Sequence, residues 1–134
     1  MSAYLLDSNV CVEYIRDRNQ SVVARIKREP MQNIRLCSVV LGELYCGAFR
    51  SADPIKNLAL LRRFAGKFTS LPFDDIAAAI YGEERTRLEK LGTPIGPHDM
   101  QIAAIALASG LTIVTHDVAE FSGIPRLLVE DWQV

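Results

Sequence analysis

Four acidic residues occupy positions where carboxylates could take part in catalysis. Asp7 ends the short apolar run 3–6, and Asp117 follows a second apolar run at 111–115. Asp99 precedes the most apolar segment of the chain, and Glu43 lies within an apolar helical pattern. Each acid alone has an ordinary explanation as a turn, cap or surface residue. Their occurrence together suggests a shared site.

Glu43 is the acid that a purely structural role explains least well. Its neighbours at helical spacing are Val39, Val40 and Gly47, so the carboxylate lies along an apolar stripe. No Arg or Lys stands at helical spacing in the same helix. Because a buried carboxylate without a partner is destabilising or becomes protonated, we expect Glu43 to meet a group from elsewhere in the fold.

Four carboxylates gathered at one edge of a fold could not all remain ionised without a cation. Oxygen-only ligands select the hard ions Mg²⁺ or Mn²⁺, which bind one or two carboxylates together with waters and substrate phosphate. Such an ion activates water and stabilises an in-line displacement at phosphorus. The chemistry predicted from the residue types is therefore phosphodiester hydrolysis.

Several polar residues flank these acids. Ser8, Asn9 and Thr115 could orient a carboxylate or a water, although helix-cap and strand-end roles explain them equally well. His98 and His116 each adjoin an acid without zinc-site spacing, so they are candidates for phosphate contact. The chain has no G-x-S-x-G, P-loop or G-x-G-x-x-G motif, which leaves acyl transfer, NTP hydrolysis and dinucleotide chemistry without support.

An alternation of strands and helices would position these residues. Strands are predicted at 3–7, 34–37, 70–73, 111–115 and 126–129, and helices at 10–15, 22–29, 39–50, 54–68, 74–91 and 100–108. Ser8 or Asn9, Ser38 and Asp53 are the expected caps of the first, third and fourth helices. The order predicts parallel strands in a doubly wound α/β domain, whose strand ends form the ligand-binding edge.

Composition narrows the class of protein. A length of 134 residues fits a single domain at 1–134, and 49% hydrophobic with 23% charged residues is globular composition. Without a signal peptide or a membrane-spanning stretch, we expect a soluble cytoplasmic protein. A formal net charge of −1 argues against a general polyanion binder. Cys11, Cys37 and Cys46 lack ligand spacing and are expected to be reduced and buried.

Four segments resemble the acidic motifs of PIN-domain nucleases, and more narrowly those of VapC toxins from type II toxin–antitoxin operons. They are Leu5–Asn9, Ser38–Leu44, Ile95–Ala104 and Thr115–Phe121, which follow the family order over nearly the whole chain. The resemblance implies a PIN-like α/β/α sandwich: a parallel sheet of about five strands in the order 3-2-1-4-5, with helices on both faces. It also implies a Mg²⁺- or Mn²⁺-dependent endoribonuclease, a cognate antitoxin whose tail occupies the acidic groove, and a homodimer.

The motif positions suggest a role for each acid. Asp7, Glu43 and Asp99 match the core metal-site acids of the family, and Asp117 matches its fourth, more variable position. Our leading hypothesis is a toxin that cleaves RNA, with transfer RNA as the family-level expectation for the substrate. In this hypothesis all four acids are catalytic residues: Asp7, Asp99 and Asp117 bind the ion, and Glu43 helps to activate water. Phe121, in the last motif, is interpreted as core packing.

Contacts to RNA are expected from basic residues on helix faces. Arg85 and Arg87 are the candidates for binding the backbone phosphates, which position a nucleic acid without specifying its sequence.

Two alternatives remain open. A phosphotransfer or phosphatase domain of the receiver or haloacid-dehalogenase type also places Asp at the end of the first strand. Those domains require a second acid soon after the first and a lysine at a strand end. Here Asn9 stands where the second acid would be, and no Lys follows 111–115. A catalytically silent PIN-like interaction module would keep the fold, but acids at all four positions argue against it.

Overall fold

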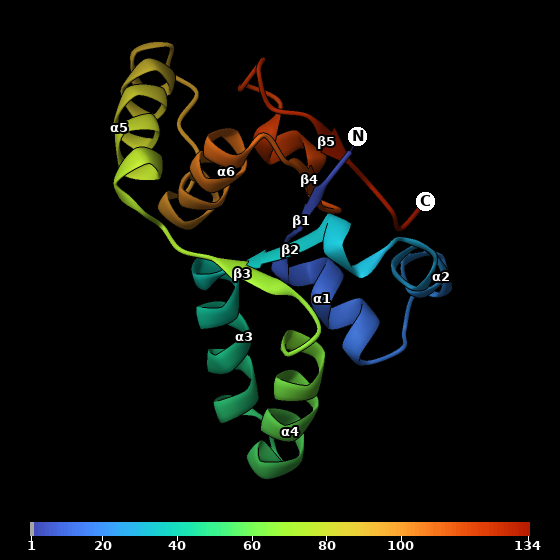
Figure 1. Ribbon diagram of the computed structural model, residues 1–134. Helices are drawn as coiled ribbons and strands as arrows, with labels where there is room; N and C mark the ends of the chain where they lie inside the picture. Colours follow the sequence, from blue (N-terminus) through green and yellow to red (C-terminus); the bar gives the residue numbers. More distant parts are fainter. Residues whose placement is uncertain (1) are drawn as a thin grey trace.

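Five parallel strands form the centre of the molecule, whose computed structural model describes residues 2–134 (Figure 1). They are β1 (Tyr4–Leu6), β2 (Ile34–Cys37), β3 (Thr69–Leu71), β4 (Thr112–Val114) and β5 (Val129–Glu130), in the order β3-β2-β1-β4-β5. The predicted fold class and strand order are confirmed. In the central strand, Tyr4 pairs with Ile34 on one side and with Thr112 on the other.

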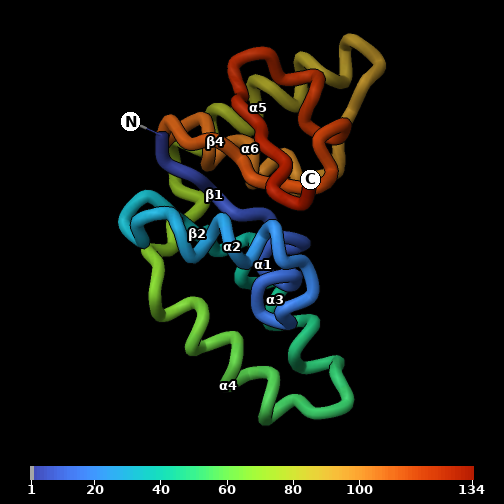
Figure 2. The backbone as a smooth tube through the Cα atoms, turned by 90° about the vertical axis from the view of Figure 1, so that its right-hand side faces the viewer, coloured from blue at the N-terminus to red at the C-terminus, as the bar shows by residue number. Residues whose placement is uncertain are grey.

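Six α-helices connect the strands within the described residues. They are α1 (Ser8–Ile15), α2 (Gln20–Arg28), α3 (Ser38–Arg50), α4 (Pro54–Ala65), α5 (Asp75–Lys90) and α6 (Pro97–Ser109), with short 3-10 turns at Met31–Asn33 and Val118–Phe121. Helices α5 and α6 pack beside each other, and α3 and α4 form a hairpin that projects away from the sheet (Figures 1 and 2). No helix in residues 2–134 combines the length and apolarity needed to cross a bilayer.

The most apolar segment forms the buried helix α6, as predicted. Pro97 occupies its first turn, and residue 100 and residues 102–106 are buried. Gly110 ends the helix with φ of 66°, a left-handed conformation that glycine adopts without a steric penalty. Phe121 is also buried, at 1% exposure, in agreement with its predicted packing role.

Two of the predicted helix caps are wrong. Asp7 caps α1, because its Oδ1 accepts a hydrogen bond of 2.8 Å from the backbone N–H of Ser8. Ser38 is the first residue of α3, and its hydroxyl donates to the carbonyl of Leu71 at 3.3 Å. In both cases the strand turns into the helix earlier than the polar pattern indicated, by one or two residues at α1 and by one residue at α3. Asp53 caps α4 as predicted, accepting from the N–H of Lys56 at 3.2 Å.

Element boundaries and some exposures also differ from the predictions. Helix α4 ends at Ala65 rather than near residue 68, and β5 lies at Val129–Glu130 rather than 126–129. Leu128, which was placed in the last strand, is 68% exposed. Cys46 is exposed, whereas the other two cysteines are buried as expected. An apolar residue in a short segment can face water, because small folds cannot cover all their apolar surface.

Glu84 is a buried carboxylate that joins α5 to the segment after the second 3-10 turn. Its Oε2 accepts from Arg87 Nε at 2.7 Å, and its Oε1 accepts from Arg126 Nη2 at 3.0 Å. Arg87 also donates to the carbonyl of Gly123 at 2.9 Å. Desolvation by burial acts to raise the pKa of Glu84, but the two arginines outweigh it and the pKa lies below its ordinary value.

Replacing Glu84 with alanine should therefore destabilise the fold by about 1–3 kcal/mol at pH 7. A depressed folded pKa means that the stabilisation is complete above the unfolded value of about 4.3 and disappears as the pH falls through the folded value. Urea denaturation of both proteins between pH 7 and 3 should thus show a gap that narrows in acid. Glu83→Ala is the control, because that side chain is 77% exposed; an equal loss in the two variants would contradict the assignment.

Candidate active site

Asp7 lies at the carboxyl end of β1 and is only 4% exposed. The hydroxyl of Thr115 donates to its Oδ2 at 2.8 Å, opposite the Ser8 N–H on Oδ1. Burial raises the pKa of Asp7, although these two hydrogen bonds act in the other direction, and the charge of Asp117 raises it further. The central strand therefore delivers a carboxyl group that is costly to ionise.

Glu43 faces α1 from α3. The hydroxyl of Ser8 donates to its Oε2 at 3.2 Å, which supplies the partner from elsewhere in the fold that we expected. Its other oxygen, Oε1, is buried and has no hydrogen-bond partner in residues 2–134. Desolvation raises the pKa of Glu43, and the neighbouring charge of Asp7 adds to this. Glu43 thus presents one satisfied and one free oxygen.

Asp99 lies in the first turn of α6, as predicted from the sequence. Desolvation, followed by the charges of nearby carboxylates, raises its pKa to about 6. After Asp7, the second of these charges in strength belongs to Glu120, followed by Glu43 and Asp117. Glu120 was not among the predicted catalytic residues, because it lies in a 3-10 turn whose direction the sequence did not reveal.

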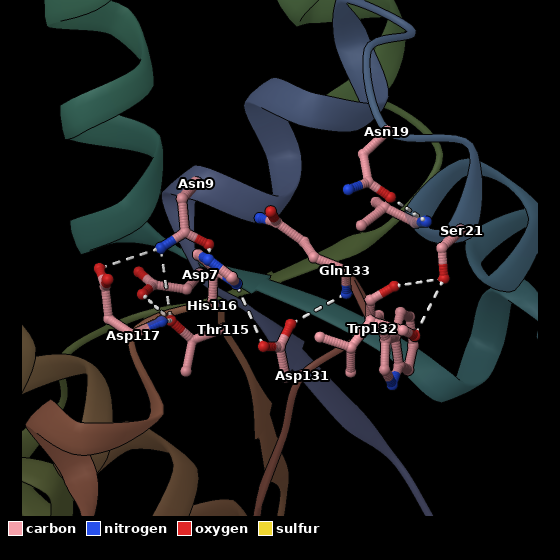
Figure 3. A network of polar contacts seen from close by, with 12 residues as sticks. Asp7, Asn9, Asn19, Ser21, Thr115, His116, Asp117, Asp131, Trp132 and Gln133 are labelled. Carbon is pink, nitrogen blue, oxygen red and sulfur yellow. Dashed lines mark hydrogen bonds and ion pairs between the residues drawn. The ribbon is translucent and has the colours of Figure 1, made fainter.

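A network of side chains connects Asp117 to the same place (Figure 3). Asn9 Nδ2 donates to Asp117 Oδ2 at 3.2 Å and to Thr115 Oγ1 at 3.4 Å. The backbone N–H of Asp117 donates to Thr115 Oγ1 at 3.0 Å, and that hydroxyl in turn donates to Asp7. His116 donates its backbone N–H to Asn9 Oδ1 at 3.3 Å, while its ring lies 3.1 Å from Asp131 Oδ2.

The four predicted acids line one open pocket of about 830 Å³. Ser8 and Asn9 line it as well, and Thr115, the residue after β4, lies behind it and donates to Asp7. The structure thus brings together the acids and the flanking polar residues that the sequence singled out. His98 is exposed near the start of α6, close enough to Glu43 for a positive charge there to lower the pKa of Glu43, against the larger effect of desolvation.

The arginines proposed for RNA contact lie elsewhere. Arg85 contacts the hydroxyl of Tyr81 and pairs with Glu89 at 3.7 Å, and Arg87 is bound to Glu84. Neither lines the pocket, whose basic residues are instead Arg16, Arg18 and Lys56. The sequence did not reveal these three as a group, because Arg16 and Arg18 follow one helix and Lys56 lies in another, and only the packing of the two brings them to one pocket.

Comparison with known proteins decides the family. A PIN domain model matches residues 4–127. The tRNA(fMet)-specific endonuclease VapC of Salmonella typhimurium is 36% identical over 134 residues, with 98% of this chain and 99% of that protein covered. The chain belongs to the PIN-domain family, among the VapC ribonucleases. The predicted family and enzyme class are confirmed.

Solved structures of the family have the same fold. The crystal structure of DNA-bound VapBC from Salmonella typhimurium superposes with a TM-score of 0.91 at 35% identity, covering 98% of this chain and 99% of that one. VapBC-5 from Mycobacterium tuberculosis, described as a member of the VapBC family of toxin-antitoxin systems, has a TM-score of 0.72 at 25% identity, with both chains fully covered at 100%.

PIN-domain ribonucleases generally depend on a divalent metal ion, and the residues of this pocket fit such an ion by their chemistry. All the candidate ligand atoms are oxygens. One of them, Glu43 Oε1, is buried without a hydrogen-bond partner in residues 2–134, and the pKa of Asp99 is raised to about 6. In residues 2–134, no three His, Cys, Asp or Glu side chains are placed so that all of them could hold one metal ion directly. Because Mg²⁺ uses one or two carboxylates and keeps several waters, the site suits a hydrated ion better than a closed cage.

Thr115→Val should test the hydroxyl that connects Asp7 with Asp117. Loss of its hydrogen bonds should lower the free energy of unfolding by about 1–2 kcal/mol and raise the pKa of Asp7 further. Urea denaturation and carbon-detected NMR of the carboxyl groups measure the two effects. Thr112→Val, at the opposite end of β4, is the control that removes a buried hydroxyl away from the acids. Equal shifts of the Asp7 pKa in both variants would contradict this role.

Asp99→Asn should stabilise the metal-free protein by about 1 kcal/mol at pH 7. A folded pKa of about 6 means that the stability associated with protonated Asp99 is present below about pH 4 and lost as the pH rises through 6. The two-unit shift corresponds to about 2.7 kcal/mol, which solvent screening and the lost favourable interaction with the helix N-terminus reduce.

Asp75→Asn, in the first turn of α5, is the matched control, because it removes only the favourable interaction of a carboxylate with a helix N-terminus. It should lower stability by a few tenths of a kcal/mol. Denaturation of both variants in EDTA between pH 4 and 7 separates the effect of the pocket on the Asp99 charge from the effect of the helix N-terminus. A loss of stability in Asp99→Asn at pH 7 that equals the loss in Asp75→Asn would mean that desolvation and like-charge repulsion do not disfavour the ionised Asp99.

Proposed function

We propose that this chain is a Mg²⁺- or Mn²⁺-dependent endoribonuclease toxin that hydrolyses RNA phosphodiester bonds. The observation that carries the proposal is the convergence of Asp7, Glu43, Asp99 and Asp117 on one pocket. Four neighbouring carboxylates would repel a polyanionic substrate, so they are compatible with its hydrolysis only if they bind a cation. The ribonuclease class of the family agrees with this interpretation.

The proposed roles follow from the contacts of each acid. Asp7, Asp99 and Asp117 would bind the ion, directly or through its waters, and Thr115 and Asn9 would keep two of these carboxylates in place by hydrogen bonding. When bound, the ion would supply Lewis-acid stabilisation of the negative charge that develops at the scissile phosphate.

Glu43 is proposed to accept the proton of the attacking water. Its Oε2 is oriented by Ser8, its Oε1 is free, and desolvation makes its carboxylate more basic than an ordinary glutamate. Water then adds to phosphorus, one P–O bond breaks, and the departing oxygen takes up a proton.

The substrate and partners are proposed from the relatives. The Salmonella typhimurium relative is named as specific for tRNA(fMet), so transfer RNA is the first substrate class to test. Solved relatives are VapBC complexes of toxin–antitoxin systems, which supports a cognate antitoxin that covers the acidic pocket of this chain. We also propose that the chain forms a homodimer, with two acidic pockets along a shared groove.

Incubation of the purified protein with transfer RNA and other RNAs tests the proposal. Cleavage should require Mg²⁺ or Mn²⁺ and stop in EDTA. Asp7→Asn and Asp99→Asn should each reduce the rate by at least about a hundredfold, because an ion-binding carboxylate supports several kcal/mol of transition-state stabilisation. Asp75→Asn should retain wild-type activity. Since all four proteins are purified identically, the inactive variants also exclude a contaminating nuclease.

Two outcomes would contradict the proposal. A folded wild-type protein that cleaves none of the RNAs with either ion would favour the catalytically silent interaction module. Cleavage that persists in both aspartate variants would place the chemistry outside this pocket.

A further inference from the structure

The acidic pocket continues away from the sheet as a trough between three helices. On each helix the lining residues repeat at intervals of about one turn, which places them on one face. They are Ser8, Asn9, Val12, Glu13, Ile15 and Arg16 along α1, Glu43, Leu44, Gly47 and Ala48 on α3, and Lys56, Asn57, Leu60 and Leu61 on α4. At 1.5 Å per residue, the trough follows α1 for roughly 13 Å from Asp7 to Arg16.

The two ends of the trough carry opposite charge. The four acids lie at the sheet end, while Arg16 follows the last turn of α1 and Lys56 lies in the first turn of α4. Helix α4 begins at the tip of the hairpin, away from the sheet (Figure 1), and Lys56 belongs to its first turn. Arg18 is paired with Glu13 at 3.1 Å, whereas Arg16 and Lys56 have no ion pair within residues 2–134.

The wall between these ends is open and combines apolar side chains with the polar Glu13 and Asn57. It includes Val12, Leu44 and Leu60. Gly47 lines it in the interior of α3, where glycine costs about 0.5–1 kcal/mol relative to alanine. A Cβ at this position would meet no atom within 4 Å, so packing does not require a glycine. The missing side chain leaves the trough wider.

We propose that this trough binds the single-stranded RNA segment next to the scissile phosphate, with Arg16 and Lys56 contacting backbone phosphates. The inference rests on the proposed ribonuclease function and adds a substrate-binding subsite to it. A pocket of about 830 Å³ is on the scale of a few nucleotides, not of a duplex. Phosphates satisfy the two unpaired cations, and sugar and base faces can lie against the apolar side chains of the wall.

Charge-neutralising variants test the subsite directly. RNA binding by Arg16→Gln and Lys56→Gln, measured by fluorescence anisotropy in an Asp99→Asn background that prevents cleavage, should each weaken about 3- to 10-fold. Each variant should also reduce the slope of log K against log salt by about 0.7. In the cleavage-competent protein, KM for RNA should rise by a similar factor with kcat unchanged. Arg62→Gln and Arg63→Gln are the controls, since both residues are exposed on α4 outside the trough.

A steric variant provides a second, independent measurement. Gly47→Leu should fill the trough and weaken RNA binding at least tenfold, without lowering the melting temperature. Gly42→Leu is its match, because Gly42 is exposed on the same helix, also lacks atoms within 4 Å of a Cβ, and does not line the trough.

The outcomes separate this subsite from the function on which it rests. If the wild-type protein cleaves RNA with metal but the trough variants bind RNA like their controls, the subsite is wrong and the ribonuclease proposal survives. Loss of binding to a protein partner with an unchanged KM for RNA would assign the trough to protein docking and overturn the inference. Absence of metal-dependent cleavage in the wild type would instead reject the proposed function.

Discussion

The parallel pairing of β1 with β4 is the constraint on which the site depends. It sets Leu6 opposite Val114, and the backbone N–H of Asp7 donates to the Val114 carbonyl at 2.9 Å. Both strands therefore end at the same edge, where Thr115 meets Asp7 one residue past the last pair. A slip of one residue would turn Thr115 to the other face of the sheet and break the connection between the carboxylates.

Carboxylates have opposite physical roles in two parts of this fold. Glu84 is buried with two arginines that stabilise its charge, and its pKa is lowered. Asp7, Glu43 and Asp99 are desolvated beside one another, and their pKa values are raised. The first arrangement stabilises the folded chain, whereas the second makes the acids of one pocket costly to ionise, first by desolvation and then by mutual repulsion. Repulsion of this kind is typical of sites whose acids are positioned for chemistry rather than for stability.

Local pattern was sufficient to predict the fold class and the four acids of the pocket. The apolar runs at the strands and the apolar helix α6 are strong signals, because burial imposes composition directly on the sequence. The position of Glu43 on an apolar stripe likewise indicated a partner from another element, which is Ser8. The motifs, through their resemblance to a known family, added the strand order and the enzyme class.

Only the tertiary structure decided how charge is distributed around the pocket. The sequence predicted Arg87 as an RNA contact. In the fold Arg87 pairs with Glu84, three residues earlier on α5, and only tertiary packing brings Arg126 to the same carboxylate and the Gly123 carbonyl to Arg87. Arg16 and Lys56 lie 40 positions apart in the chain and share a trough because α1 and the α3–α4 hairpin pack together. The local pattern of apolar residues determines which side chains must be buried. Long-range packing determines which charged side chains from different elements lie together, and this cannot be read from local spacing.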